Sequence, residues 1–458
     1  MLRQKVKEQR ELPRLGYLGE TTSPHSLHRA DGNGQQTALR RQNLSRLLRE
    51  VHVHGPLSRS ILAGAMGVNR TTVGSLVADL TSRGLVEERL PPDNPGPGRP
   101  SPLVGPRADG LVVLAAEIAT DSLAVAVVGL GGAIVVSQRV SRPRGIRPAT
   151  DEIAQLGRVA RGCMAEVGAD QRFTAGGISI PGLVRRADGF VRLAPNLDWH
   201  DLPLAHLVTQ ELGMNMPIFV GNDADLAALA EHTRGAGVGQ ADFICLWGEA
   251  GIGAGIIAGG RQLEGRAGYA GEVGHVTVNP EGRLCRCGSR GCWETEVGEE
   301  ALLRGNGEAS GCAWTDVDAL LQAAADGDPA ARATLDRAGH WLGIGIAGLI
   351  DIFNPGALAL GGLYARLYPH VRSAILAEVA RRTLGTSQGQ VDIGPVALGD
   401  DGALLGAAEL AFASAIADPT TVPRRETREA RSQPAATAVE RHTAVRKQGG
   451  VPAAQHTA

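Results

Sequence analysis

The protein has 458 residues, of which 43% are hydrophobic and only 3% aromatic, and its 46 basic residues nearly balance 48 acidic ones. This length predicts two to four globular domains, each large enough to bury a core of its own. The six cysteines are too few and too unevenly spaced for a secreted disulfide framework, which excludes a small disulfide-stapled scaffold.

Both ends of the chain have the composition of tails. Residues 1–38 and 418–458 are polar and lack an apolar period, which predicts two disordered segments. The first twenty residues contain no apolar stretch of signal-peptide length, so we expect a cytoplasmic protein. The longest uncharged run, residues 122–138, has the pattern of a strand hairpin and not of a membrane span of roughly 20 apolar residues, so no membrane association is expected.

Residues 39–107 form a basic module with ten arginines against five acidic residues. An apolar i, i+3, i+4, i+7 spacing predicts a first helix, Ser58 can cap a second that Gly67 ends, and Asn69 can cap a third. Two helices joined by a short turn and followed by a strand are typical of a winged helix-turn-helix. The module is therefore predicted to bind DNA.

The third helix of this module is the predicted reader. We expect its first turns to contact a double-stranded operator, together with the start of the second helix and the Pro/Gly-rich wing and linker. The side chains expected to make these contacts are Arg59, Asn69, Arg70, Thr71, Thr72, Ser75 and Arg99. The alternative is a three-helix packing module with an ordinary charged face. The proline-rich run at residues 91–106, which no helix can cross, separates the module from the rest of the chain.

Residues 108–417 alternate strands and helices, which predicts an α/β body. The expected strands are residues 111–118, 123–128, 133–140, 175–179, 218–220, 241–247 and 253–257, and the expected helices include residues 152–166 and 224–232. The length suits two lobes with a boundary near residue 221. A cleft between two lobes is where ligands usually bind.

The strongest chemical motif consists of one histidine and three cysteines within eighteen residues: His275, Cys285, Cys287 and Cys292. These ligand types at this spacing predict a closed, structural Zn²⁺ site, because four protein ligands leave no position for water. Gly288 and Gly291 allow the tight turn that such a site needs. The alternative is three reduced cysteines and an unrelated histidine.

Several short segments together resemble the ROK family, named for repressor, open reading frame and kinase. The matching segments are residues 179–182 (SIPG), 221–224 (GNDA), 271–275 (GEVGH), 285–294 (CRCGSRGCWE), and 354–355 (NP) ahead of the glycines at 361–362. The resemblance covers roughly residues 39–417, including the DNA-binding module of the repressor branch. It implies an actin-like, two-lobed sugar kinase fold in which zinc shapes the sugar pocket.

The family's sugar-binding groups match six residues of this chain: Asn196, Asn222, Asp223, Glu272, His275 and Glu294. Carboxylates and amides are suited to this role, because they bond to hydroxyl groups and reject ligands that lack them. His275 would link metal and sugar, with one ring nitrogen toward each. Taken singly, Glu272 or Asn196 would more often be a surface or capping residue.

The family's kinases use the aspartate at the position of Asp223 as the base that accepts the proton of the attacking hydroxyl. They also need two glycine-rich turns that hold the phosphates of ATP. The first should read DxGGT, but residues 117–121 read EIATD. In the second, residues 248–255 (GEAGIGAG), Ala250 stands where kinases carry a threonine. The sequence therefore predicts a degenerate ATP site, with Asp223 catalytic only if kinase activity is retained.

These features together predict a sugar-responsive DNA-binding regulator, a repressor of carbohydrate-utilisation genes. Its expected partners are an operator, a sugar or sugar phosphate effector, and further copies of itself in a homodimer or homotetramer. Two alternatives stay open: an ATP-dependent sugar kinase with a DNA-binding appendage, and an architectural DNA-binding protein whose body only dimerises.

Overall fold

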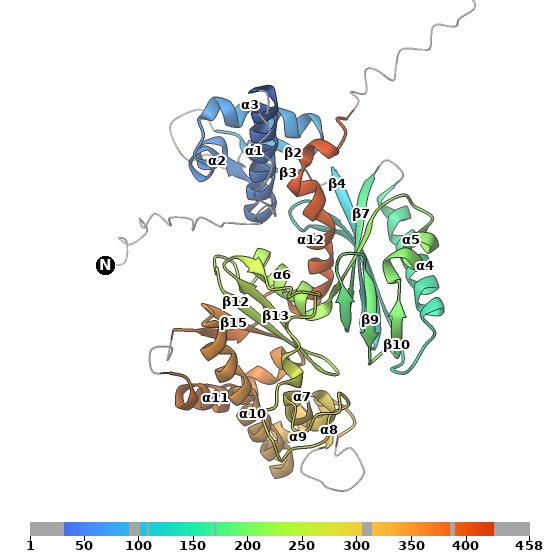
Figure 1. Ribbon diagram of the computed structural model, residues 1–458, viewed down its shortest axis with the longest axis vertical. Helices are drawn as coiled ribbons and strands as arrows, with labels where there is room; N and C mark the ends of the chain where they lie inside the picture. The colour runs from blue at the N-terminus through green and yellow to red at the C-terminus, as the bar shows by residue number, and fades with distance from the viewer. Residues whose placement is uncertain are drawn as a thin grey trace, which may run out of the picture.

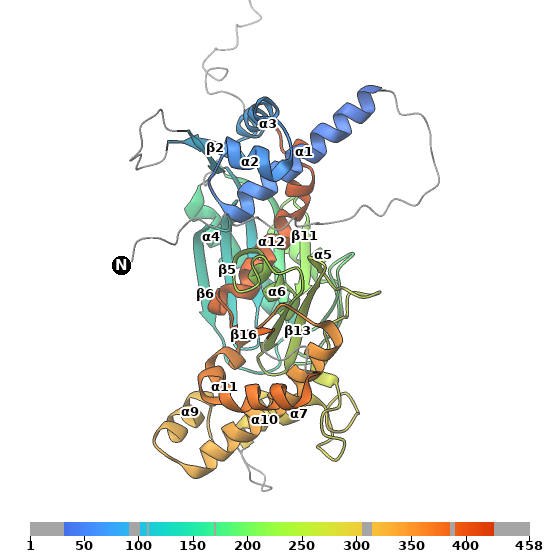
Figure 2. The same ribbon diagram turned by 90° about the vertical axis from the view of Figure 1, so that its left-hand side faces the viewer.

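The computed structural model describes residues 32–90, 101–107, 110–168, 171–304, 314–384 and 390–425. They form an N-terminal module and two lobes, each lobe built on a five-stranded sheet (Figure 1 and Figure 2). Among these residues, no helix is both long enough and apolar enough to cross a membrane.

The N-terminal module consists of three helices and a small antiparallel sheet with strand order β1-β3-β2. Its elements are α1 (Gly32–His54), β1 (Leu57–Ser58), α2 (Arg59–Met66), α3 (Arg70–Ser82), β2 (Val86–Arg89) and β3 (Leu103–Pro106). The predicted caps are confirmed: Ser58 accepts the N–H of Ile61, and Asn69 that of Thr72. Gly67 ends α2 in the left-handed conformation, with φ of 67°. The two helices and their turn thus form where local sequence predicts them.

The start of the module differs from the prediction. α1 begins at Gly32, so residues 32–38 are helical where the sequence predicts a disordered tail. The side chains of residues 34–42 are exposed and mostly polar, so this part of the helix has no apolar period that could reveal it. Arg99 and the rest of segment 91–100, the predicted wing, lie outside the described residues.

The first lobe contains a sheet with strand order β11-β7-β4-β5-β6. Its strands are β4 (Leu111–Ile118), β5 (Ser122–Gly129), β6 (Ile134–Ser141), β7 (Arg172–Ile180) and β11 (Ile218–Asn222). Two helices, α4 (Ala149–Val167) and α5 (Leu204–Leu212), pack on one face. A smaller sheet of β8 (Leu183–Arg185), β9 (Phe190–Ala194) and β10 (Trp199–Leu202) belongs to the same lobe. The predicted hairpins followed by helix–strand alternation are confirmed.

The second lobe contains a sheet with strand order β14-β13-β12-β15-β16. Its strands are β12 (Phe243–Gly248), β13 (Ile252–Ala258), β14 (Arg261–Gln262), β15 (Ala357–Gly362) and β16 (Asp392–Pro395). Its helices are α7 (Trp293–Val297), α8 (Glu299–Arg304), α9 (Val317–Ala325), α10 (Pro329–Phe353) and α11 (Leu363–Arg382). α10 and α11 pack against each other, and α11 also covers β15 (Figure 1).

Two helices lie between the sheets of the lobes, α6 (Asp223–Arg234) and α12 (Gly402–Ala417). α12 packs on β4 and β7, α6 packs on β12 and β13, and the two helices pack against each other. Their backbones touch: a Cβ atom added to Gly406 would lie 1.9 Å from the carbonyl oxygen of Leu226, and one added to Gly177 of β7 would lie 1.9 Å from that of Ala407. α6 therefore packs closely on α12, and α12 packs equally closely on the sheet of the first lobe.

The end of the body returns to the N-terminal module. Residues 418–425 are described, and they include the 3-10 turn η3 (Pro419–Thr421), where the sequence predicts a disordered tail from residue 418. The guanidinium of Arg83 at the end of α3 donates to the carbonyl oxygens of Thr420 and Val422 at 3.0 and 2.7 Å. One hydrophobic core runs from the module through α12 into the first lobe and includes Leu47, Leu80, Leu404 and Phe412.

Replacing the glycine at the contact between α12 and α6 should destabilise the protein. In Gly406→Ala the new methyl group would collide with the carbonyl of Leu226 and push the helices apart. We expect the free energy of unfolding to fall by about 1–3 kcal/mol, the usual effect of overpacking a core. Calorimetry would show this as a lower Tm.

Gly348→Ala is the matched control, because no atom lies within 4 Å of a Cβ added at this exposed position of α10. Alanine in a helix interior is favoured over glycine by about 1 kcal/mol, so this variant should be as stable as the parent or more so. Equal Tm values for the Gly406 variant and the parent protein would contradict the contact between the helices.

Candidate functional site

The predicted histidine and cysteine ligands come together beside α7. His275 ends the short turn η1 (Val273–His275), and Cys292 immediately precedes α7. The ligand atoms of all four residues lie within 4.8 Å of one another, with Cys285 Sγ 3.7 Å from His275 Nδ1 and Cys287 Sγ 3.6 Å from Cys292 Sγ. All three cysteines are free thiols. This cluster, the His/Cys cluster, could hold one metal ion.

Glycines shape the loop that carries these ligands. Gly288 and Gly291 have φ values of 91° and 71°, which confirms the predicted turn, because side chains other than that of glycine rarely adopt this conformation. A Cβ atom on Gly291 would also lie 1.5 Å from the carbonyl oxygen of Asn279. No other residue can therefore occupy this position without moving the loop.

The N-terminus of α6 holds two of the predicted sugar-binding residues. Asn222 caps the helix: its Oδ1 accepts the N–H of Asp225 at 3.1 Å, and its Nδ2 donates to the carbonyl oxygen of Gly182 at 3.1 Å. Asp223 is buried, and its Oδ1 accepts the N–H of Ala224 at 2.9 Å. The amide of Asn222 thus joins two segments that the sequence singled out separately, residues 179–182 and 221–224.

Glu272 links Asp223 electrostatically to the two predicted residues on its other side, His275 and Glu294. Burial, together with the negative charges of Glu117 and Glu272, raises the pKa of Asp223 to about 7. Burial also raises the pKa of Glu272, which lies near His275 and Glu294. The tertiary structure therefore brings Asp223, Glu272, His275 and Glu294 into one region, although up to 71 residues separate them in sequence.

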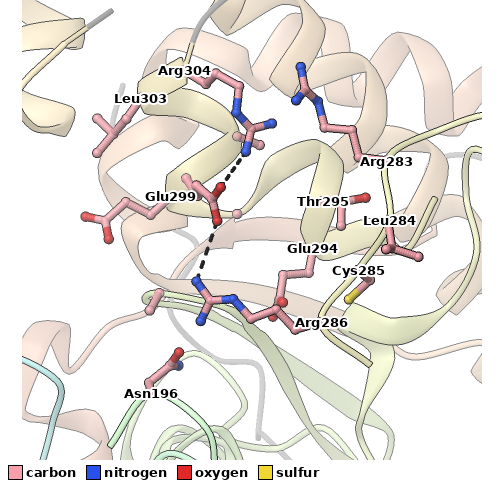
Figure 3. Close-up of a pocket in the computed structure, with 14 residues that line it drawn as sticks. Asn196, Arg283, Leu284, Cys285, Arg286, Glu294, Thr295, Glu299, Leu303 and Arg304 are labelled. Atoms are coloured by element: carbon pink, nitrogen blue, oxygen red, sulfur yellow. Dashed lines mark hydrogen bonds and ion pairs between the residues drawn. The ribbon is translucent and has the colours of Figure 1, made fainter. Parts of the chain in front are cut away.

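A cavity of about 340 Å³ lies next to this region (Figure 3). It is lined by Asn196, which follows β9, and by Glu294 and Thr295 of α7. Asn222, Asp223, Glu272 and His275 are not among its lining residues. The structure therefore places only two of the six predicted sugar-binding residues on this cavity's wall.

Arginines that were not predicted from the sequence line the same cavity. Arg304 contacts Glu300 at 2.7 Å, and Arg286 lies 3.6 Å from the same carboxylate (Figure 3). Arg283 also lines the cavity. Arg283 and Arg286 stand in the cysteine-rich segment, so the sequence could have indicated them as neighbours of the metal ligands, whereas Arg304 has no such signal.

The predicted degenerate turn between β4 and β5 is filled by ion pairs. Glu117 is buried and contacts Arg139 at 2.9 Å. Arg144 contacts Asp121 at 3.2 Å and also pairs with Glu299 of the second lobe. Aligned with DxGGT, Glu117 takes the place of the aspartate, and Asp121 with its partner Arg144 takes the place of the threonine, so the added negative charge in this turn comes from Asp121.

The second turn, between β12 and β13, carries Glu249. Its Oε1 accepts the indole N–H of Trp247 at 3.4 Å, while its buried Oε2 has no hydrogen-bond partner among the described residues. Burial and the charges of Asp223 and Glu117 raise its pKa well above the usual range. A carboxyl group in this turn is unfavourable for a phosphate, because ionisation would place two like charges together.

The predicted DNA-binding residues gather at the start of α3. Asn69, Arg70, Thr71 and Ser75 are exposed, and Thr72 is half-buried. Arg59 differs, because its guanidinium makes two 2.7 Å hydrogen bonds to Glu88 of β2. Arg40 of α1, which was not predicted because it precedes the apolar period, donates to Ser75 at 3.2 Å and contacts Asp79 at 2.9 Å.

Comparisons with known proteins match both parts of the chain. A model of the ROK family matches residues 113–414. The xylose repressor of Bacillus subtilis is 28% identical over 375 residues, which are 81% of this chain and 95% of the repressor. The glucokinase of Streptomyces coelicolor is 32% identical over 317 residues, which are 66% of this chain and 97% of the glucokinase.

Solved structures match in the same two ways, a regulator over most of this chain and a glucokinase over about two thirds of it. A ROK family transcriptional regulator, described as a homologue of the E. coli MLC protein, is 25% identical with a TM-score of 0.70, and the match covers 84% of this chain and 99% of that one. A ROK family glucokinase from Streptomyces griseus, in complex with glucose and AMPPNP, is 30% identical with a TM-score of 0.57, covering 66% of this chain and 99% of the glucokinase. The matches to regulators are longer than the body, so they extend into the N-terminal module.

Asp223→Asn should stabilise the ligand-free protein at high pH. The pKa of Asp223 rises from roughly 4 in the unfolded chain to about 7 in the fold, so ionisation of its carboxyl group progressively destabilises the fold between these values. The neutral amide removes this loss and keeps the acceptor for Ala224. We expect the gain in unfolding free energy to be larger at pH 8 than at pH 5, by up to about 3 kcal/mol.

Thermal unfolding at the two pH values measures this difference. Asp336→Asn, which changes an exposed carboxylate on α10, serves as the control for the removal of a negative charge. A gain for Asp223→Asn that does not depend on pH would contradict the raised pKa.

Proposed function

The chain belongs to the ROK family, and we propose that it is a sugar-responsive DNA-binding regulator that represses carbohydrate-utilisation genes. One observation carries the proposal: a module with an exposed helix start shares its core with a kinase-like body whose first phosphate turn is filled by ion pairs. Asp121 would place a negative charge beside a phosphate bound in that turn. A sugar-responsive repressor needs to bind only DNA and a sugar. We expect this protein in the cytoplasm.

We propose that the N-terminal module is a winged helix-turn-helix that reads a double-stranded operator. The accessible residues Asn69, Arg70, Thr71 and Ser75 suit base and phosphate contacts at the start of a reader helix, and Thr72 flanks them. Arg59 would contact phosphate only by leaving Glu88, and Arg99 stays a sequence-based expectation. A homodimer or homotetramer would place two readers on the half-sites of an inverted repeat.

We propose that the effector is a sugar or sugar phosphate bound between the lobes. Asn196, Asn222, Asp223, Glu272, His275 and Glu294 would hydrogen-bond its hydroxyl groups. Asn196 comes from the first lobe and Glu294 from the second, so a ligand that contacts both would favour one arrangement of the lobes. Such a preference is what a sensor needs, because a ligand shifts an equilibrium only by its differential affinity.

A sugar kinase with a DNA-binding appendage is the second candidate. It is favoured by the retained Asp223 and by relatives that are glucokinases. Against it, the first turn lacks both glycines of DxGGT and gains Asp121, and the second turn carries Glu249. Phosphoryl transfer depends mostly on positioning and charge neutralisation, which these turns do not favour.

Zinc is the metal that we propose for the His/Cys cluster. Thiolates and imidazole are its preferred ligands, and the 3.6 Å between two of the sulfur atoms is near the roughly 3.8 Å edge of a tetrahedron with Zn–S distances of about 2.3 Å. Four protein ligands make it a structural ion that would hold this loop in shape. Since Nδ1 of His275 faces the cluster, Nε2 is left for a sugar hydroxyl.

Cys292→Ser should remove the metal. We expect about one zinc per chain in the native protein and little in the variant, because serine is a poor zinc ligand, as measured by elemental analysis of the purified proteins. Sugar affinity should fall as well, since His275 would lose its anchor. Cys163→Ser is the control, because this buried thiol under β5 lies outside the cluster, and this variant should contain as much zinc as the parent. Full zinc content in the Cys292 variant would overturn the assignment.

Binding of the DNA upstream of its own gene tests the function. Fluorescence anisotropy should show tight binding that changes when D-xylose, D-glucose or N-acetyl-D-glucosamine, free or phosphorylated, is added. Arg70→Ala should weaken operator binding by about 1–3 kcal/mol, because it removes a base or phosphate contact. Arg366→Ala on α11, far from the module, is the control and should bind as the parent does.

Two results would decide for the alternatives. Sugar-dependent transfer of phosphate from ATP that disappears in Asp223→Asn would identify a kinase. Operator binding without any sugar-dependent change in Tm would identify an architectural DNA-binding protein, since a body without a ligand site gains no stability from sugars.

A further inference from the structure

We infer that α6 transmits the occupancy of the sugar site to the DNA-binding module through a buried group of side chains around His52. This group, the His52 cluster, consists of His52 of α1, Gly131 between β5 and β6, Arg234 of α6 and Glu409 of α12. The inference rests on the proposed function, because it needs a sugar at one end of α6 and DNA beyond the other. Arg234 and His52 are positioning residues in this scheme.

His52 joins the module to the body. It lies in the last turn of α1, and only 1% of it is exposed. Its Nδ1 accepts the backbone N–H of Gly131 at 3.0 Å, and its Nε2 lies 2.9 Å from Glu409 Oε2. The ring also packs edge-on against Phe412, with 5.2 Å between the ring centroids. Its Nε2 also lies 2.6 Å from Arg234 Nη2, so the same ring nitrogen meets both the carboxylate of Glu409 and the guanidinium of Arg234.

Arg234, the last residue of α6, ties this helix to all the other members of the cluster. Its Nη1 donates to the carbonyl oxygens of His52 and Gly131 at 3.1 and 2.7 Å. Its Nε and Nη2 donate to Glu409 Oε1 at 2.8 and 2.6 Å. A Cβ atom on Gly132 would lie 2.4 Å from Arg234 Nε, so this neighbour must be a glycine. One guanidinium group thus connects α6 with α1, α12 and the β5–β6 turn.

The opposite end of α6 begins at the proposed sugar site. Asn222 caps the helix and Asp223 is its first residue, whereas Arg234 is its twelfth. A helix of this length is about 18 Å long. Among the described residues, α6 is the element that carries predicted sugar-binding residues at one end and a contact with the module at the other. α12 also contacts His52, but it carries none of the predicted sugar-binding residues.

The packing of α6 lets this helix move only as a rigid body. Leu226, Ala227 and Ala228 are buried, and Gly406 of α12 and Gly255 of β13 allow backbone contact on two sides. A helix held in this way shifts along or about its axis and does not bend. Arg234 and Glu409 are mostly buried, so neither charge can leave its partner cheaply. A shift of α6 is therefore passed to α1 and to the orientation of α3.

Arg234→Lys tests the transmission in the full-length protein. Lysine keeps the charge opposite Glu409, but its single ammonium group cannot also reach both carbonyl oxygens. We expect the Kd values for the operator and for the sugar to stay within about threefold of the parent values. The factor by which the sugar changes the operator Kd should fall from the usual range of allosteric coupling, about 5–150-fold, to less than about threefold.

His52→Gln is the second variant, because glutamine keeps a donor and an acceptor but has no ring to pack on Phe412. It should lose the sugar response in the same way. Arg161→Lys is the control: this arginine also makes two hydrogen bonds to an acidic residue, Glu211, but both belong to the first lobe, so its sugar response should be retained. Either cluster variant that binds sugar and operator and keeps the full response overturns the inference.

Hydrogen exchange of the parent protein tests the same inference without a variant. The amide of Gly131 is bonded to His52, so addition of D-xylose, D-glucose or N-acetyl-D-glucosamine, free or phosphorylated, should change its exchange rate and those of residues 50–54. A sugar that binds and alters operator affinity without changing these rates overturns the inference. If none of these sugars binds, the proposed function itself fails, which separates the two failures.

Discussion

The direct contact between the backbones of α6 and α12 is the constraint on which the rest of the structure depends. At Gly406 there is no room for even a methyl group between the helices, and at Gly177 α12 touches the central sheet of the first lobe in the same way. The two sheets are therefore joined through one closely packed pair of helices. One end of that pair carries Asp223 and the other carries Arg234 and Glu409. The proposed sugar site and the N-terminal module are thus attached to the same pair of helices.

Charge explains why this body suits a sensor better than a kinase. Asp121 and Glu249 bring carboxyl groups to the two turns that would hold phosphate in a kinase, and Arg144 pairs with Asp121. Asp223, the base of the related kinases, is buried beside Glu117, and its raised pKa keeps it partly protonated near neutral pH. A carboxyl group in this state can still hydrogen-bond a hydroxyl, so the proposed sugar site is compatible with changes that disfavour nucleotide binding.

Features that depend on neighbouring residues were predictable from the sequence. Ser58, Gly67 and Asn69 cap and end helices where their side chains predict it, and the cysteine-rich turn has glycines where φ is positive. The order of strands and helices followed from hydrophobic periodicity. The start of α1 was not predictable in this way, because its exposed, mostly polar residues have no apolar period. The structure of residues 418–425 was not predictable either, because it depends on Arg83, which is more than 330 positions away.

The sequence by itself determined the fold class, the metal-ligand motif, the weakened nucleotide turns and the family, because each is encoded in short segments whose residue types limit their chemistry. Only the tertiary structure decided which of these segments meet. It placed Asp223 beside Glu117 and Glu272, surrounded Glu300 with Arg286 and Arg304, and buried His52 against Arg234 and Glu409. Contacts between residues tens to hundreds of positions apart depend on packing and burial, and no local pattern records which charges will share a low-dielectric space.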